Sequence, residues 1–367
     1  MSIPFIDLQS QQARIKPALD RAIAQVLNHG QYIMGPEVAE LERKLSDYVD
    51  MPHCITVASG TEALLISLMA LGIGPGDEVI TTPFTFVATV EVIVLLGAKP
   101  VFVDVELSTC NIDASLIEAK ITQKTKAIIP VSLYGQAPDM TEINAIAERN
   151  GGIAVIEDAA QSFGATYQGR KSCGLSSIAC TSFFPSKPLG CYGDGGAIFT
   201  SDADIAKAAR EIRVHGQSQR YVHTRVGVGG RMDTLQCAIV LAKLTQFEWE
   251  IEQRLSIGRT YNQLIDDIGV ERVRQKDDRT SVFGQYTILV DERDRIQAQL
   301  GEQGVPTAVH YPVPLNRQPA YHHLCCADCT PNADWAAARV MSLPMSPYLS
   351  EEAQIKIVNS LKIAIFA

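Results

Sequence analysis

The sequence lacks the features that mark several classes of protein. No uninterrupted apolar run approaches the ~20 residues that a membrane-spanning helix needs, and residues 1–5 resemble no signal peptide. Basic residues are outnumbered, with 32 Lys and Arg against 41 Asp and Glu, and they form no basic stripe. These absences argue against a membrane protein and a nucleic-acid-binding protein, and we expect a cytoplasmic location.

The nine cysteines are scattered along the chain, and in the cytoplasm we expect them to be reduced thiols. One segment nevertheless gathers several possible metal ligands: His322-His323-Leu-Cys325-Cys326-Ala-Asp-Cys329. The spacing is compatible with zinc, but the segment is polar, lies between two prolines and has no second pair of ligands nearby. We predict a mobile loop with incidental cysteines and no metal site.

A chain of 367 residues, 46% of them apolar, can build a large domain and a smaller one. We predict a large domain over residues 1–250 and a small α/β domain over 251–367. Strands are predicted at 55–58, 76–82, 99–105, 126–135, 152–158, 178–184 and 195–201. Helices are predicted at 15–27, 37–49, 62–71, 114–120, 140–150, 203–213 and 232–254. This alternation favours a mixed, mainly parallel sheet, in which the last strand is antiparallel to its neighbour.

The segment around Lys187 carries the strongest indication of chemistry. It reads Ile178-Ala-Cys-Thr-Ser-Phe-Phe-Pro-Ser-Lys187-Pro-Leu-Gly190, a β-rich run that ends in a tight loop. Desolvation lowers the pKa of a lysine and leaves a neutral amine that attacks carbonyl groups. One interpretation is therefore a lysine that forms a Schiff base, and the other is a loop lysine that points into water.

A second segment decides between these interpretations. Residues 152–164 form a hydrophobic strand that ends at Glu157-Asp158 and continues to Gln161. Ligands of open α/β sheets bind beyond the carboxyl ends of strands. An aspartate for the ring nitrogen and a lysine for the aldehyde are what pyridoxal phosphate (PLP) requires. Alone, Asp158 would be interpreted as a helix N-cap, but together with Lys187 it predicts a PLP site.

Two further segments suit the same cofactor. The helix predicted from Glu62 begins at Gly60-Thr61, and a helix N-terminus offers free N–H groups to a phosphate. An ordinary capped helix explains these residues equally well. Phe86 follows a predicted strand, where its ring either stacks on a planar ligand or packs in the core.

Residues 157–164, Glu-Asp-Ala-Ala-Gln-Ser-Phe-Gly, and 182–190, Ser-Phe-Phe-Pro-Ser-Lys-Pro-Leu-Gly, resemble the DegT/DnrJ family of PLP-dependent nucleotide-sugar aminotransferases. The likeness runs from Phe5-Ile-Asp-Leu to Ser342-Leu-Pro-Met. It implies fold type I of the PLP-dependent transferases, which is aspartate aminotransferase-like, with a seven-stranded sheet and a smaller C-terminal α/β domain. Within the family, the segments are most similar to members that aminate a UDP-linked 3-keto-hexuronic acid for bacterial surface polysaccharide (O-antigen).

The resemblance also implies roles for single residues. Lys187 binds the cofactor and moves protons, Asp158 holds the ring nitrogen, Gln161 meets the phenolic oxygen, and Ser182 meets the phosphate. The complete set of implied cofactor contacts is Gly60, Thr61, Phe86, Asp158, Gln161, Ser182 and Lys187. The implied substrate contacts are Gly30, Tyr32, Ser186, Arg231, His310 and Tyr311.

The stretch 213–236 is the most basic part of this acidic chain. A solvated loop is one interpretation, and a loop whose guanidinium groups bind carboxylate and phosphate is the other. The resemblance implies that Arg231 binds the substrate carboxylate and that the loop reaches a neighbouring subunit, so that a homodimer shares its active sites. The family usually has an asparagine at the position of Gly229, whose side chain reaches the PLP phosphate across the dimer, and glycine removes that contact.

The implied reaction moves the amino group of glutamate, leaving 2-oxoglutarate, to the 3-keto carbon of a UDP-linked 2-acetamido-2-deoxy-hexuronic acid. One alternative is the same fold acting on a different keto position or a different nucleotide sugar. A dehydratase of the family, in which histidine replaces the lysine, is disfavoured by Lys187. The third alternative is a regulatory protein that binds PLP without turnover.

Overall fold

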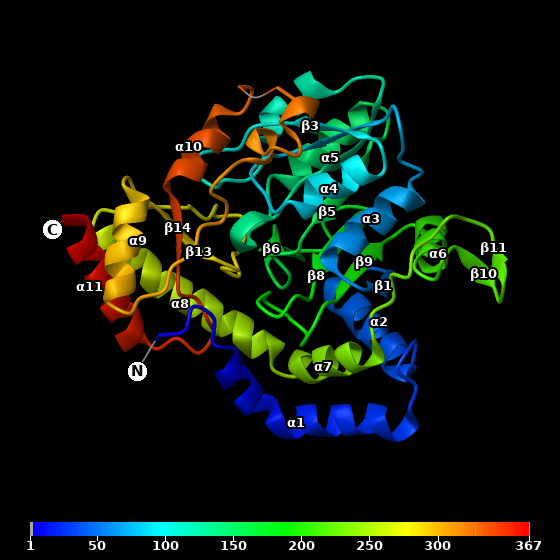
Figure 1. Ribbon diagram of the computed structural model, residues 1–367, viewed down its shortest axis with the longest axis horizontal. Helices are drawn as coiled ribbons and strands as arrows, with labels where there is room; N and C mark the ends of the chain where they lie inside the picture. Colours follow the sequence, from blue (N-terminus) through cyan, green and yellow to red (C-terminus); the bar gives the residue numbers. More distant parts are fainter. Residues whose placement is uncertain (1–2, 327, 367) are drawn as a thin grey trace.

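The computed structural model describes residues 3–326 and 328–366. Its centre is a seven-stranded sheet (Figure 1). The strand order across the sheet is β1 (His53–Val57), β9 (Gly196–Thr200), β8 (Ile178–Ser182), β5 (Ala154–Asp158), β4 (Thr125–Ile129), β2 (Glu78–Thr81) and β3 (Lys99–Phe102). Strand β9 is antiparallel to both β1 and β8, whereas the other pairs are parallel. The predicted mixed, mainly parallel sheet and the antiparallel last strand are confirmed.

Helices cover both faces of this sheet, because successive strand residues point to opposite sides. Ala179 and Phe199 join one apolar cluster with helices α2 (Pro36–Val49) and α7 (Thr234–Leu244). Their neighbours in the same strands, Cys180 and Ile198, point to the opposite face. They join another cluster with α3 (Gly60–Ala70), α4 (Ala88–Leu95) and α6 (Ala203–Ile212). Strands buried on both faces explain the nearly continuous apolar runs in the sequence.

The N-terminal helix α1 (Leu8–His29) packs along α7. The side chain of Asp7 accepts a hydrogen bond from the N–H of Ser10 and caps the helix start. Gly30 ends the helix in the left-handed region, with φ 69°. The helix therefore stops directly before the segment that carries Tyr32.

The C-terminal part has its own sheet and core. Strand β13 (Tyr286–Leu289) lies between β12 (Glu271–Arg272) and β14 (Val340–Leu343), all antiparallel. Helices α8 (Phe247–Asp267), α9 (Arg293–Glu302) and α11 (Glu351–Phe366) contribute to one apolar cluster with this sheet. Both chain termini lie on this side of the molecule (Figure 1), and the N–H of Met345 donates to the carbonyl of Phe5.

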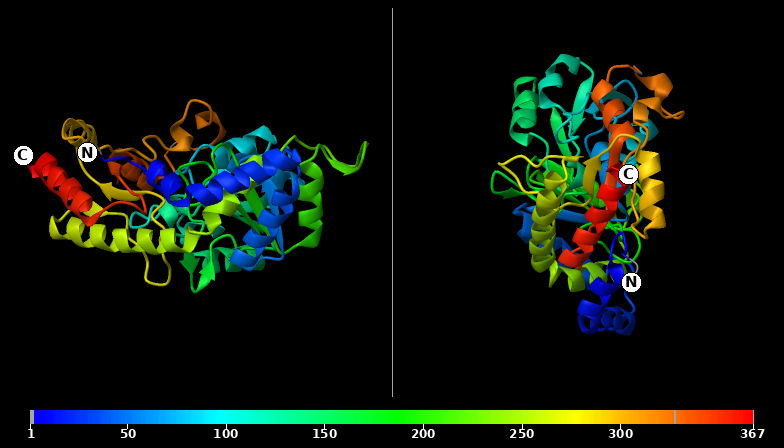
Figure 2. Two further views of the ribbon diagram at one scale, coloured as in Figure 1. Left: turned by 90° about the horizontal axis from the view of Figure 1, so that it is seen from below. Right: turned by 90° about the vertical axis from the view of Figure 1, so that its left-hand side faces the viewer.

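The smaller elements complete the chain. Helix α5 (Met140–Arg149) contacts β5, and α10 (Pro331–Arg339) precedes β14. Two hairpins are formed by β6 (Thr166–Tyr167) with β7 (Arg170–Lys171) and by β10 (Gln217–Gln219) with β11 (Val222–His223). The β10–β11 hairpin stands away from the body of the molecule in two views (Figures 1 and 2). No helix in residues 3–326 and 328–366 has the length and apolar character needed to cross a membrane.

Three predictions about local structure were wrong. The predicted helix 114–120 is two short 3-10 turns, Ala114–Leu116 and Glu118–Lys120. The single helix predicted at 232–254 is divided into α7 and α8 at residues 245–246. Cys326 and Cys329 are joined by a disulfide, so the expectation of reduced thiols is wrong for these two cysteines.

Candidate active site

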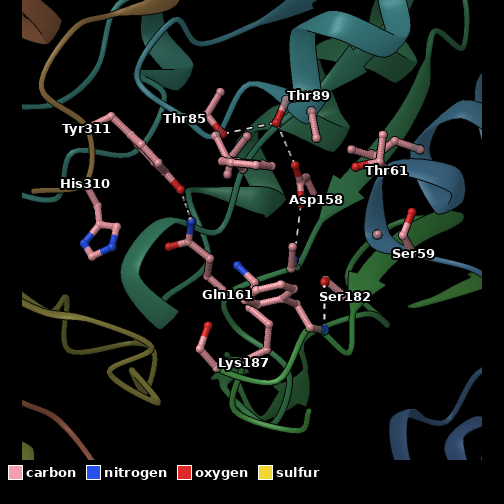
Figure 3. A pocket seen from close by; sticks show the side chains of 18 of the residues that line it. Ser59, Thr61, Thr85, Thr89, Asp158, Gln161, Ser182, Lys187, His310 and Tyr311 are labelled. Atoms are coloured by element: carbon pink, nitrogen blue, oxygen red, sulfur yellow. Dashed lines mark hydrogen bonds between the residues drawn. The ribbon is translucent and has the colours of Figure 1, made fainter. Parts of the chain in front are cut away.

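A cavity of about 430 Å³ opens at the carboxyl ends of the central strands (Figure 3). It gathers side chains that follow β1, β2, β5 and β8, together with a segment from the C-terminal part. Ten of the predicted site residues line it: Gly60, Thr61, Phe86, Asp158, Gln161, Ser182, Ser186, Lys187, His310 and Tyr311. Residues that the sequence did not single out also line it, among them Ser59, Thr85, Thr89, Asp194 and Gln285.

Asp158 and Lys187 come from the ends of adjacent parallel strands, β5 and β8. The carboxylate of Asp158 is buried, with 5% of the residue exposed. Its Oδ2 accepts a hydrogen bond from Thr89 Oγ1 at 2.9 Å, and its Oδ1 accepts one from the N–H of Ala160 at 3.2 Å. These contacts fix the carboxylate so that it faces the cavity with Lys187 (Figure 3).

Burial pushes both groups toward their neutral forms. It raises the pKa of Asp158, while the hydrogen bond from Thr89, the N–H of Ala160 and the charge of Lys187 oppose that rise. Burial also lowers the pKa of Lys187, against the pull of the Asp158 carboxylate. The lysine is therefore suited to supply a neutral amine, and the aspartate is suited to a cationic partner in the cavity.

The start of α3 is shaped to hold a phosphate. Ser59 caps the helix by accepting a hydrogen bond from the N–H of Glu62 at 3.0 Å. A Cβ on Gly60 would lie 2.7 Å from Cβ of Ser182, so only glycine lets the helix start approach the end of β8 this closely. This leaves the first N–H groups of α3, with Thr61 and Ser182, at the cavity wall.

These residues fit PLP. The α3 start, Thr61 and Ser182 would hold its phosphate, Asp158 its ring nitrogen and Lys187 its aldehyde. Phe86 lines the same cavity with its side chain half exposed, as a residue that stacks on a ring would be.

The opposite wall is a hydrogen-bonded frame around Gln161. Its Oε1 accepts the N–H of Tyr134 at 2.9 Å, and its Nε2 donates to the hydroxyl of Tyr311 at 3.2 Å. The hydroxyl of Tyr134 donates to the carbonyl of His310, and Nδ1 of His310 lies 3.0 Å from Ser342 Oγ. Burial and the charge of Lys187 lower the pKa of His310 to about 4, so this imidazole is neutral at pH 7.

Three predicted substrate contacts, Gly30, Tyr32 and Arg231, do not line the cavity. They lie together elsewhere, because Ile33 pairs with Asp233 in an antiparallel bridge and the N–H of Thr234 donates to the carbonyl of Tyr32 at 3.0 Å. Tyr32 is 48% exposed. The roles of all the site residues stay predictions.

The site residues that the sequence missed carry weak signals. Thr85 and Thr89 are uncharged and follow a strand, where hydroxyl side chains are common in turns and caps. Their spacing of four residues was no usable signal, because Thr85 lies before α4, whose first residue is Ala88. Ser59 was identifiable as an N-cap three residues before Glu62.

Comparison with known proteins identifies the chain. Residues 13–362 match the model of the DegT/DnrJ/EryC1/StrS aminotransferase family. The UDP-2-acetamido-2-deoxy-3-oxo-D-glucuronate aminotransferase of Pseudomonas aeruginosa is 58% identical over 356 residues, which cover 97% of this chain and 98% of the relative.

Solved structures agree with these matches. A DegT DnrJ EryC1 StrS aminotransferase from Brucella abortus is 42% identical, with a TM-score of 0.94 and complete coverage of both chains. NtdA from Bacillus subtilis, solved with bound cofactor PMP, is 30% identical, with a TM-score of 0.92 over 100% of this chain and 86% of its own. The predicted family, fold type I and cofactor are thereby confirmed. The chain belongs to the DegT/DnrJ/EryC1/StrS aminotransferase family, and its cofactor is pyridoxal phosphate.

Proposed function

We propose that this protein transfers the amino group of glutamate to the 3-keto carbon of a UDP-linked 2-acetamido-2-deoxy-hexuronic acid, for the synthesis of a surface polysaccharide. The observation that carries the proposal is the placement of Asp158 and Lys187 at adjacent strand ends in one cavity, opposite a helix start that only Gly60 permits. The choice of sugar is supported by the 58% identity to the Pseudomonas aeruginosa enzyme over nearly the whole chain.

When bound, PLP supplies a carbonyl carbon and an electron sink that makes the Cα proton of the amino donor acidic. Lys187 Nζ would accept that proton and later donate one, and it would do so in the opposite order for the keto sugar. Asp158 would pair with the ring nitrogen in its carboxylate form, which Thr89 and the N–H of Ala160 stabilise. Gln161, whose Oε1 is held by the N–H of Tyr134, would offer its amide N–H₂ to the phenolic oxygen.

We further propose that two copies of the chain share their active sites. Arg231 and Tyr32 lie together outside the cavity that their implied role requires them to reach. Large apolar side chains are exposed beside Tyr32, at Ile33 and Met34, and in the hairpin segment, at Tyr221 (79% exposed) and Val226 (85% exposed). A monomer rarely leaves such side chains uncovered in one region, and a second copy would bury them and bring Arg231 to the cavity of its partner.

The proposal is tested by incubating the PLP-loaded protein with glutamate and a UDP-3-keto sugar and measuring the aminated product by mass spectrometry. We expect the UDP-3-keto-hexuronic acid to react faster than the corresponding UDP-3-keto-hexose, which has a hydroxymethyl group in place of the carboxylate, because Arg231 binds the carboxylate. Arg231→Leu should abolish this preference, whereas Arg220→Leu, in the same basic stretch 213–236, should keep it. Equal rates with both sugars in the unmodified protein would overturn the uronic acid assignment.

A further inference from the structure

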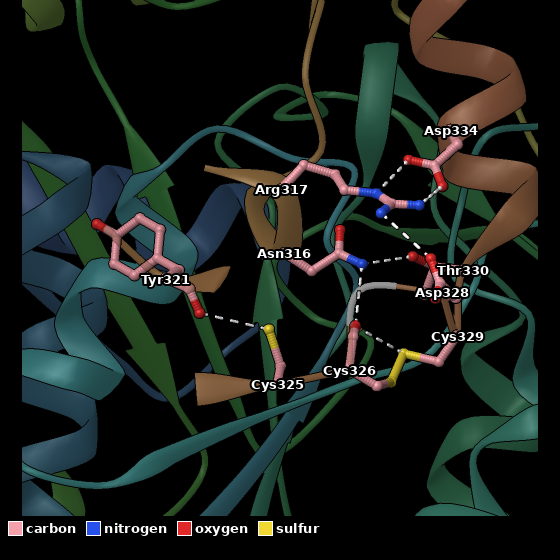
Figure 4. Close-up of a disulfide and its surroundings, with 9 residues drawn as sticks. All are labelled: Asn316, Arg317, Tyr321, Cys325, Cys326, Asp328, Cys329, Thr330 and Asp334. Atoms are coloured by element: carbon pink, nitrogen blue, oxygen red, sulfur yellow. Dashed lines mark hydrogen bonds and ion pairs between the residues drawn. A yellow bond between two sulfur atoms is a disulfide. The ribbon is translucent and has the colours of Figure 1, made fainter. Parts of the chain in front are cut away.

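The segment between Tyr311 and α10 carries a disulfide that the proposed reaction does not use. Cys326 and Cys329 are joined two residues before the helix, with Cys325 beside them as a free thiol (Figure 4). The other free cysteines of the chain are buried. The cysteines that are not buried therefore all belong to this segment.

The disulfide is poorly suited to stabilising the fold. It spans a sequence separation of 3, and loop-closure entropy grows with loop length, so this short loop contributes little. Other contacts already hold the segment. Nδ2 of Asn316 donates to Thr330 Oγ1 at 2.9 Å, and the guanidinium of Arg317 pairs with Asp334 at 2.8 Å (Figure 4).

The disulfide is well suited to reversible exchange. Cys326 is exposed, and exposed disulfides are typical of labile and regulatory sites rather than structural ones. We expect this chain to work in the cytoplasm, and disulfides in cytoplasmic proteins are mostly transient. By contrast, burial raises the pKa of the Cys191 thiol to about 11 and that of Cys110 to about 12, which leaves those thiols unreactive.

The segment is coupled to the cavity through a small apolar cluster. Cys325 and Tyr321 pack against a cluster formed by buried Val90, Phe102 and Leu315. The N–H of Leu315 donates to the carbonyl of Pro83 at 2.9 Å, and Pro83 lies three residues before Phe86 at the cavity wall. At its other end the same segment begins directly after His310 and Tyr311. A change of conformation around Cys326 and Cys329 can therefore shift Phe86 on one wall of the cavity and His310 and Tyr311 on the other.

We propose that Cys326–Cys329 is a reversible thiol–disulfide exchange site, reduced by a dithiol protein of the thioredoxin class or by two molecules of a monothiol such as glutathione, and that its state tunes binding of the keto sugar. A thiolate of the reductant bonds to Cys326 Sγ while the S–S bond breaks, and Cys329 leaves as a thiolate that takes up a proton. A second reductant thiol then displaces Cys326, so that the reductant becomes a disulfide and two electrons have passed to the protein.

The exchange is tested on the full-length, PLP-loaded protein in a series of glutathione buffers of increasing oxidised fraction. Free thiols are alkylated and the peptides identified by mass spectrometry. We expect the alkylated fraction of Cys326 and that of Cys329 to fall together as the buffers become more oxidising, because disulfide-bonded sulfur is not alkylated. The buried cysteines should stay unmodified throughout. Alkylation of both residues in the most oxidising buffer, or of neither in the most reducing one, would overturn the proposal.

Two variants control the pairing. Cys325→Ser should keep the transition, whereas Cys329→Ser should remove it and leave Cys326 alkylated throughout. A disulfide that still forms in Cys329→Ser contradicts the assigned pair. Circular dichroism should be unchanged on reduction, and unfolding on reduction would instead identify the disulfide as a structural link.

The coupling is tested by the KM for the UDP-keto sugar in the oxidised and reduced forms. We expect a difference of about fivefold with kcat nearly unchanged, and no difference in Cys329→Ser. An identical KM in both forms would refute the coupling. This arm depends on the proposed aminotransferase activity, but the alkylation experiment does not, so a failure of either idea can be distinguished.

Discussion

Thr89 donates its hydroxyl hydrogen to Oδ2 of Asp158 at 2.9 Å, and Thr85 Oγ1 lies 3.1 Å from the same hydroxyl. Since the Thr89 hydrogen is committed to the carboxylate, Thr85 donates to Thr89 in this chain. The two threonines thereby stabilise the ionised form of an aspartate whose pKa burial raises. They link the start of α4 to the end of β5, which carries Asp158.

Thr89→Val should weaken PLP binding about tenfold, because a hydrogen bond to a charged group contributes about 1.5–3 kcal/mol. Valine has nearly the same volume as threonine, so the expected loss of PLP affinity reflects the missing hydrogen bond and not a change in packing. PLP affinity is measured by absorbance titration of the cofactor-free protein. Thr85→Val, which removes only the more distant donor, should have a smaller effect. Wild-type affinity in Thr89→Val would show that the threonine does not support Asp158.

His310 should make the folded protein less stable in mild acid. Its pKa is about 4 in the folded chain against an ordinary value of 6.5, so the unfolded chain binds a proton at pH values where the folded chain does not. His310 therefore costs no stability above about pH 6.5, and the cost grows to roughly 3 kcal/mol as the pH falls to about 4. Urea unfolding between pH 7 and pH 4 measures it.

His310→Gln provides the control, because glutamine cannot take up the proton. The difference in unfolding free energy between the two proteins should change with pH across this window. If both proteins lose stability in parallel, His310 is not the group responsible.

Gly258 and Gly301 are two helical glycines of the C-terminal part, and alanine substitutions at them compare a tightly packed position with an open one. A Cβ on Gly258, in α8, would lie 2.1 Å from Cε2 of Phe283, whereas a Cβ on Gly301, in α9, meets nothing within 4 Å. Gly258→Ala should therefore lower the unfolding free energy by roughly 1–3 kcal/mol through displacement of the ring. Gly301→Ala should leave it unchanged or raise it by up to about 1 kcal/mol. Chemical denaturation of both variants checks this, and equal values would contradict the close packing on Phe283.

Gly229→Asn should bind PLP more tightly than the natural chain, because in the proposed dimer with shared active sites the asparagine would reach the phosphate held by the partner subunit. The added Cβ would lie 3.1 Å from Cε1 of His215, so this ring has to move by a few tenths of an ångström. Cofactor dissociation during dialysis measures the effect. Equal or faster loss of PLP from Gly229→Asn would show that glycine costs this protein no cofactor affinity.

Much of the cavity was predictable, because the two key residues follow hydrophobic strands and are flanked by turn residues. Lys187 and Asp158 are such cases, and the parallel pairing of β5 with β8 brings them together. His310 and Tyr311 were placed by resemblance alone, since nothing local in the sequence shows that a segment from the C-terminal part returns to the central sheet.

The sequence could not show where the long helix divides. Residues 232–254 contain no proline, and the break at 245–246 is followed by a helix whose first turns pack in the central core and whose later turns pack with the C-terminal sheet. The disulfide was missed for a similar reason. Spacing of three residues suits a metal, a disulfide or neither, and the structure shows that the two sulfur atoms are bonded.

The most direct test of the proposed reaction is the absorbance spectrum of the PLP-loaded protein during titration with glutamate. We expect the band of the lysine-bound cofactor to convert to that of its amine form, and a UDP-3-keto-hexuronic acid to restore the first band. Lys187→Ala should show neither conversion at a comparable rate, with a loss of at least about a thousandfold. A spectrum that glutamate does not change, or one that is the same with and without Lys187, would contradict the assignment of Lys187 as the group that moves the proton.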